Sequence, residues 1–237
     1  TITNTRVTTE EANSQKALSA AEAGIEQLVS SRSTAGQSIP KTNLSNNSSF
    51  EAGLTPIRSN EVLLNGGSQV LKDDGADIWL STYPDFTPPL WSGNLTIYYS
   101  DNDGCSVSGG QTVNPAIEVV VISGNRANPT MTRLAYDACA GRNNNFPTPP
   151  GGGGTTPGGF AYNHNFQITI PAASPGFIAR IIPLYANTRL AVRSGANQLP
   201  SQGNNIDSVG TSGNTKRKIK VFQGWPRIPI EFFRYSI

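Results

Sequence analysis

Residues 10–29 read EEANSQKALSAAEAGIEQLV, and this stretch decides the fold. It has no proline, Gly24 is its only glycine, and most of its residues favour the α-helix. Small and apolar residues recur at the spacing of one helical face: Ala17, Ala21, Ile25 and Leu28. The stretch therefore predicts a helix with a single packing surface, to which we also assign Gly24.

The apolar face of this helix begins near Ala17. Upstream, residues 1–15 carry threonine, glutamate, asparagine and serine at the corresponding positions. We therefore expect the second half of the helix to pack on the protein's own sheet and the first half to project from it. An ordinary amphipathic helix with a frayed start is the alternative interpretation.

Beyond the helix, the chain reads as short β-strands separated by turns. Alternating apolar and polar residues are typical of half-buried strands, and residues 165–170 alternate most clearly. The candidate strands are residues 94–99, 116–122, 130–136, 165–170, 177–182, 188–193, 216–222 and 231–236. Residues 33–61 are rich in serine, asparagine and threonine and read as a loop. The predicted fold class is α+β.

One segment has low complexity. Residues 143–159 read NNNFPTPPGGGGTTPGG, which lacks the apolar side chains needed for a core. We interpret it as a flexible loop inserted between paired strands, with a domain linker as the alternative. The expected organisation is a helix over residues 1–32 and one β-rich head over residues 33–237.

Composition limits the classes of function. Of the 237 residues, 14% are charged, the net charge is +2, and there are 24 glycines and 17 prolines. This suits a β-rich secreted protein with long loops better than a helical bundle or a disordered acidic chain. A net charge this small gives no support for nucleic-acid binding. No apolar stretch of 18 residues is present, so the chain as given has no membrane span.

The two cysteines, Cys105 and Cys139, lie 34 positions apart. Neither has a second cysteine or a histidine at metal-ligand spacing. In a chain with the composition of a secreted protein, two cysteines are interpreted best as one disulfide. Two unpaired buried thiols are the alternative.

Residues that could support catalysis or metal binding are sparse. His164 is the only histidine and has no cysteine or carboxylate beside it in sequence, so we predict no enzyme. Asp101 and Asp103 precede Gly104 and resemble the opening of a calcium loop, but the remaining ligands of an EF-hand are missing. Solvated turns are the simpler interpretation, and we predict no cofactor, with calcium as the one metal candidate.

Two groups of residues could form recognition surfaces. Tryptophans and tyrosines could line a sugar-binding surface, although aromatic residues in strands more often belong to a core: Trp79, Trp91, Trp225, Tyr83, Tyr98 and Tyr99. The basic residues of segment 216–220 alternate in part with Ile219 and Val221. This pattern predicts a strand with one charged face, which is more typical of a solvated edge than of a polyanion site.

The run QKALSAAEAGIE at residues 15–26 resembles the N-terminal signature of the PilX-like minor pilins of type IV pili. In that family, a similar segment continues directly from the membrane-spanning part of the helix. Later segments also resemble the sheet of these proteins: residues 179–185, 188–192 and 216–221, with Trp225-Pro226 and the closing Phe-Phe-Arg-Tyr. Residues 33–165 carry no such resemblance.

The resemblance implies a pilin-like fold, with the N-terminal helix packed on an antiparallel sheet. It implies a non-catalytic minor pilin or pseudopilin whose partners are other pilin subunits. The expected location is an extracellular pilus, with anchoring in the inner membrane before assembly. The leader and the apolar half of the helix that the family carries are absent, so we interpret Thr1 as a cut inside a longer precursor.

A second hypothesis is a secreted, adhesin-like binding module that recognises a glycan or a cell-surface receptor. It predicts an exposed aromatic patch near Trp79 or Trp91 and no filament partner. A secreted hydrolase is the third and weakest hypothesis, because no acid–base constellation is recognisable.

Overall fold

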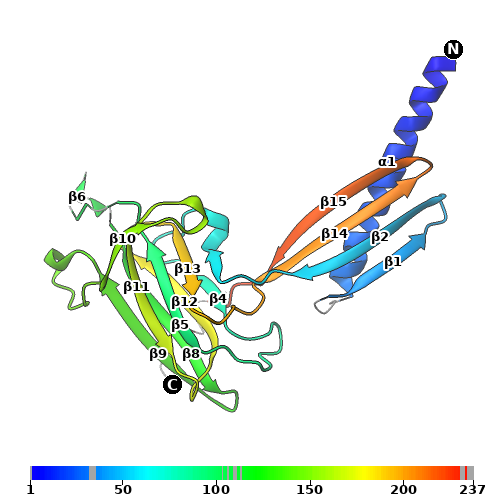
Figure 1. Ribbon diagram of the computed structural model, residues 1–237. Helices are drawn as coiled ribbons and strands as arrows, with labels where there is room; N and C mark the ends of the chain where they lie inside the picture. Colours follow the sequence, from blue (N-terminus) through cyan, green and yellow to red (C-terminus); the bar gives the residue numbers. More distant parts are fainter. Residues whose placement is uncertain are drawn as a thin grey trace. The chain divides into compact units, whose positions relative to one another are not determined.

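We describe the protein from a computed structural model (Figure 1). The structure describes residues 2–31, 36–102, 104–105, 107–108, 111–112, 114–229 and 233. Its contacts divide the chain into two compact units. Unit 1 comprises Thr1–Ile57 and Gln202–Trp225, and unit 2 comprises Arg58–Ser201 and Pro226–Ile237. Residues 33–237, expected to form a single head, are therefore divided between the two units. The residues up to Ile57 and Gln202–Trp225 join the helix, whereas Arg58–Ser201 and Pro226–Ile237 form the other unit.

Unit 1 is one long helix on an antiparallel sheet. Its elements are α1 (Ile2–Ser30), β1 (Ser38–Asn43), β2 (Ser48–Pro56), β14 (Gly203–Ser212) and β15 (Thr215–Gly224). The strands lie in the order β1-β2-β14-β15, and α1 lies along one face, against β2, β14 and β15 (Figure 1). The predicted helix and the α+β class are present. Among the described residues, no helix is long and apolar enough to span a membrane.

The loop predicted for residues 33–61 is wrong, because β1 and β2 form within it and β3 begins at its last residue. In β2, the buried Phe50, Ala52 and Leu54 alternate with the exposed Glu51 and Thr55. This is the period of a strand with one buried face. Turn residues at 44–48 hide that short signal inside a polar segment, where the amide of Leu44 bonds to the carbonyl oxygen of Ser48 over 2.8 Å.

Unit 2 contains two large antiparallel sheets and the two-stranded sheet β6-β7. The first has the order β10-β11-β5-β13-β3 and the second has the order β4-β12-β8-β9. The strands of the first are β3 (Glu61–Leu63), β5 (Gly93–Tyr99), β10 (Gly151–Thr155), β11 (Tyr162–Ile170) and β13 (Leu190–Ser194). Those of the second are β4 (Ala76–Trp79), β8 (Ala116–Asn125), β9 (Asn128–Asp137) and β12 (Gly176–Leu184). The shorter elements are β6 (Val107–Ser108), β7 (Gln111–Thr112), and the 3-10 helices η1 (Leu64–Gly67), η2 (Ala140–Arg142) and η3 (Pro157–Gly159).

The core of unit 2 lies between these two sheets. Ile97 of β5 and Phe166 of β11 join Val119 of β8 and Ile181 of β12 in one buried cluster. Each of these side chains is buried, and their neighbours in sequence point to the opposite face of the sheet. Unit 2 is therefore a β-sandwich.

The low-complexity run is partly ordered. Gly151–Thr155 forms β10, an edge strand that pairs with β11. A Cβ atom on Gly151 would lie 2.7 Å from the backbone carbonyl oxygen of Asn165, which cannot move without shifting β11, so this close approach requires glycine. The prediction of a flexible loop over 143–159 is wrong for this part, because backbone hydrogen bonds need no apolar side chain. The strand predicted at 231–236 lies outside the described residues except for Phe233.

The predicted disulfide is present, because Cys105 and Cys139 are joined by an S–S bond. It connects the segment after β5 to the segment between β9 and η2. The bridge closes a loop that contains β6, β7, β8 and β9, so it ties the ends of a long part of the sandwich together.

Candidate functional site

The sheet-facing side of α1 is built from very small residues. Ala17, Ala20 and Ala21 are fully buried. Opposite them, a Cβ atom on Gly210 of β14 would lie 1.9 Å from the carbonyl oxygen of Ala17 and 2.6 Å from the amide nitrogen of Ala21. The backbones of α1 and β14 therefore touch here. We call Ala17, Ala20, Ala21 and Gly24 the small-residue seam.

Gly24 continues the seam one turn further along the helix. A Cβ atom on Gly24 would lie 2.4 Å from Oγ of Ser208 and 2.8 Å from Cδ2 of Phe50. Beyond it, Leu28 is buried in an apolar cluster on the sheet, against which the partly buried Ile25 packs. The residues that the sequence assigned to helix packing all lie on this side of α1.

Packing of α1 starts at Asn13. The hydroxyl of Ser212 donates to Oδ1 of Asn13 over 3.2 Å, and Nε of Arg217 donates to Oγ of Ser14 over 2.9 Å. Residues 7–12 are exposed. A single polar turn therefore divides the packed part of the helix from a part that leaves the sheet.

One flank of α1 carries a row of exposed apolar residues. Val7, Leu18 and Val29 are 58%, 43% and 44% exposed. They are eleven residues apart, which is about three helical turns, so they align along the helix. We call them the outer row. Glu11, Glu22 and Glu26 are exposed on the same side of the helix.

The face of the sheet opposite α1 is basic along β15. Lys216, Lys218 and Lys220 pair with Thr211, Val209 and Asp207 of β14, which lie on the side away from the helix. Lys218 and Lys220 share the carboxylate of Asp207, at 3.0 Å and 3.5 Å. The hydrogen bond from Lys218 lowers the pKa of Asp207. The predicted charged strand is present, but its Arg217 lies on the helix side.

Of the two calcium candidates, the structure describes Asp101. Asp101 pairs with Nη1 of Arg189 at 3.0 Å, and Asp103 lies outside the described residues. Among the residues that the structure describes, no group of three histidine, cysteine, aspartate or glutamate side chains could hold a metal ion.

The aromatic residues lie mostly in cores. Trp79 and Trp91 are only 4% and 6% exposed, and Tyr98 and Tyr99 are buried. The exposed aromatic patch that a glycan-binding surface requires is therefore not present at Trp79 or Trp91. Their large apolar rings fill the space around the sandwich sheets.

His164 takes part in a polar cluster at one end of the sandwich. Its Nε2 lies 3.0 Å from Nδ2 of Asn114, and its ring lies 5.3 Å from the ring of Tyr99. Burial raises the pKa of Tyr99, so its hydroxyl stays protonated. Nearby, Asp137 and Arg142 form an ion pair of 2.8 Å. The cluster connects β5, β9 and β11.

Sequence reasoning missed the buried ion pair between Asp77 of β4 and Arg180 of β12. Both side chains are 3% exposed, and Nε and Nη2 of Arg180 each donate to the carboxylate over 2.7 Å. The amide of Ile228 donates to Oδ2 of Asp77 over 2.9 Å, and Nη2 of Arg180 also donates to the carbonyl oxygen of Ile228. The ring of Phe233 covers the guanidinium at 4.1 Å.

This ion pair fastens the segment that follows β15 onto the outer face of the second sheet of unit 2. In sequence, Asp77 belongs to an acidic group with Asp73 and Asp74, which is interpreted as a solvated turn or a weak calcium candidate. Nothing in this group points to a partner 103 residues away. The one sequence signal of a buried ion pair was Arg180 itself, because it lies among the apolar residues of β12.

Comparisons with known proteins found no relative of this chain. No family model, no curated protein and no solved structure matches this chain.

Proposed function

We propose that the chain is a non-catalytic structural subunit of a type IV pilus-like filament, a minor pilin or pseudopilin. It assembles with other pilin subunits through α1 and displays unit 2 at the cell surface. Anchoring in the inner membrane before assembly belongs to the same proposal and rests on the resemblance of residues 15–26. The observation that supports the proposal best is the two-sided character of α1.

One side of α1 is committed to its own sheet through the small-residue seam. The flank beside this seam leaves the outer row in solvent. Among the described residues, six large apolar side chains are exposed, and the outer row supplies three of them: Val7, Leu18, Val29, Leu71, Tyr185 and Phe222. Single exposed apolar residues are ordinary, but an aligned row on a helix is typical of a surface that another element covers.

The charges of unit 1 favour contact between copies. Glutamates accompany the outer row on α1, whereas lysines dominate the open face of β15. The helix of one copy can therefore face the sheet of the next. Such a contact uses two different surfaces, so it need not close into a ring and can continue as a filament.

The test uses cells that express the complete gene, with surface filaments collected by shearing. A Leu18→Glu/Val29→Glu variant should be lost from the sheared fraction by at least about tenfold, because two charges would enter a helix contact. Leu71→Glu is the matched control, since Leu71 is 58% exposed and lies in unit 2.

The control variant should enter filaments like the unmodified protein. All three proteins should show the same circular dichroism after purification. Incorporation of the outer-row variant at the normal level, or free secretion of the unmodified protein without any filament, would refute the proposal.

A further inference from the structure

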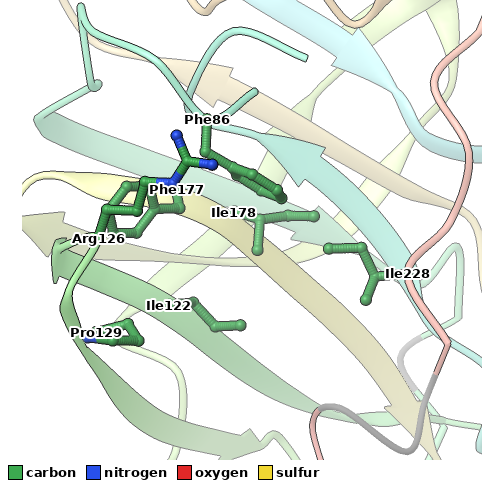
Figure 2. A pocket seen from close by; sticks show the side chains of 7 residues that line it. All are labelled: Phe86, Ile122, Arg126, Pro129, Phe177, Ile178 and Ile228. Atoms are coloured by element: carbon green, nitrogen blue, oxygen red, sulfur yellow. The ribbon is translucent and has the colours of Figure 1, made fainter. Parts of the chain in front are cut away.

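A hollow of about 440 Å³ lies on the outer face of the second sheet of unit 2. Its lining comes from β8, the β8–β9 turn, β9, β12, the loop before β5 and the segment after β15: Phe86, Ile122, Arg126, Pro129, Phe177, Ile178 and Ile228 (Figure 2). This volume lies within the range of small-molecule sites, about 300–1,000 Å³.

The floor and walls of the hollow are held in place by the fold. Phe177 and Ile178 are buried in β12 and form the floor. Ile228 is fixed through its backbone bonds to the Asp77–Arg180 ion pair. The hollow therefore exists before any ligand enters it.

Phe86 supplies the opposite wall at a conformational cost. Its φ of +51° lies in the left-handed region, which a bulky residue seldom adopts. Its ring packs at 5.2 Å from the ring of Trp79 and 6.2 Å from that of Phe177. Strained residues of this kind gather where a surface is shaped for binding.

The one charged residue of the lining is Arg126. It is exposed and makes no ion pair or hydrogen bond with any residue that the structure describes. By contrast, Arg133 on β9 of the same sheet bonds to Glu118 over 2.8 Å, and Arg180 is bound to Asp77. The hollow therefore combines apolar walls with a single available cation (Figure 2).

We propose that this hollow binds a free, single-chain carboxylate amphiphile, with its hydrocarbon chain between Ile122, Ile178 and Ile228 and its carboxylate on Arg126. An arginine guanidinium binds a carboxylate through two parallel hydrogen bonds. A sugar would find no hydrogen-bonding side chain in the lining apart from Arg126. The concave shape suits an inserted chain rather than a flat bilayer. This site is independent of filament assembly.

The probes are dodecanoate and dodecyltrimethylammonium, which share the hydrocarbon chain and differ in the sign of the head group. Each is titrated below its micelle concentration into the full chain with labelled isoleucine methyl groups. Dodecanoate should bind saturably at one site and shift the signals of Ile122, Ile178 and Ile228, whereas the cationic probe should not bind.

Arg126→Ala should weaken dodecanoate binding by about tenfold or more, because a charge-assisted hydrogen bond is lost. Arg133→Ala is the matched control and should leave the affinity unchanged. Both arginines are exposed, so neither substitution should unfold unit 2.

Four results obtained without any deletion from the chain would overturn the proposal. These are no saturable binding, equal binding of both probes, equal affinity of the Arg126→Ala variant, and binding to anionic phospholipid vesicles without binding of free dodecanoate. Dodecanoate binding that arises only when residues 234–237 are deleted would also overturn it, because the chain's own end would then be the occupant.

Discussion

Gly210 is the residue at which α1 and the sheet of unit 1 come closest. A side chain there would meet backbone atoms of Ala17 and Ala21, which cannot move without shifting the helix. The spacing of the alanines predicted one packing face of α1. The sequence did not predict that this face requires a glycine on β14. Its role depends on a contact between residues almost two hundred positions apart.

Gly210→Ala should therefore destabilise unit 1 by about 3 kcal/mol, as expected for strong overpacking. Gly53→Ala is the control, because a Cβ atom at Gly53 has no other atom within 4 Å. The free energy of opening is measured by amide hydrogen exchange of β14. Equal protection in the two variants would contradict the close approach.

Arg180 is the second residue with a sharp expected effect. Arg180→Ala leaves the carboxylate of Asp77 buried and uncompensated, which should destabilise unit 2 by about 3–5 kcal/mol in urea denaturation. Arg133→Ala breaks an ion pair that is partly exposed, so it should cost less than about 1 kcal/mol.

An Asp77→Asn/Arg180→Met variant should recover part of the lost stability, because no unpaired charge remains. If Arg180→Ala has no larger effect than Arg133→Ala, the ion pair does not hold the segment at Ile228 in place.

At the scale of elements, some strands can be predicted from the sequence more easily than others. In β11, Phe166, Ile168 and Ile170 are buried in strict alternation, and the sequence predicted this strand. In β14, Ile206, Ser208, Gly210 and Ser212 face the helix. Three of these four residues are small, because α1 lies so close, so the strand lacks the apolar alternation by which it could be recognised.

The contact of β3 with β13 supplies a prediction on pH. Arg193 of β13 donates to Glu61 of β3 and is the main cause that holds the pKa of Glu61 below its usual 4.5; the amide of Gly158 also contributes. A carboxyl with a lowered folded-state pKa stabilises the fold above its unfolded pKa. That stabilisation is lost as the pH falls below 4.5 through the folded-state pKa.

Unit 2 should therefore lose stability in acid, and Glu61→Gln should reduce this dependence on pH while leaving the dependence contributed by other carboxyls. Denaturant midpoints measured between neutral and acidic pH compare the two proteins. If the stability of the two proteins changes with pH in the same way, the protonation of Glu61 does not contribute to the pH dependence of stability.

At the scale of the whole molecule, most of unit 2 (Arg58–Ser201) is inserted between β2 and β14 of unit 1, and its last segment, Pro226–Ile237, follows β15. The amide of Ile57 donates to the carbonyl oxygen of Gly203 over 2.8 Å. The amide of Gln202 donates to the carbonyl oxygen of Ile57 over 3.1 Å. The chain thus leaves unit 1 and returns to it at adjacent points of the β2–β14 pair. Each unit also has its own apolar cluster.

We expect that replacing residues 58–201 by a short glycine-containing turn, in a chain that ends at residue 225, leaves unit 1 folded. The turn would join β2 to β14 as a hairpin, which the antiparallel register allows. Circular dichroism and amide exchange should show α1 with its four-stranded sheet. A chain that is unfolded after this replacement would mean that unit 1 depends on unit 2.

The sequence by itself determined the helix, its packing face, the disulfide and the strands with regular alternation. Each of these follows from local spacing or from the simple pairing of two cysteines. Only the tertiary structure decided the division into two units, the strand status of β14 and β10, the Asp77–Arg180 ion pair and the hollow beside it. These features depend on which distant segments of the chain come into contact. A close backbone contact at a glycine, or a buried ion pair, produces no periodic pattern of apolar residues in the sequence.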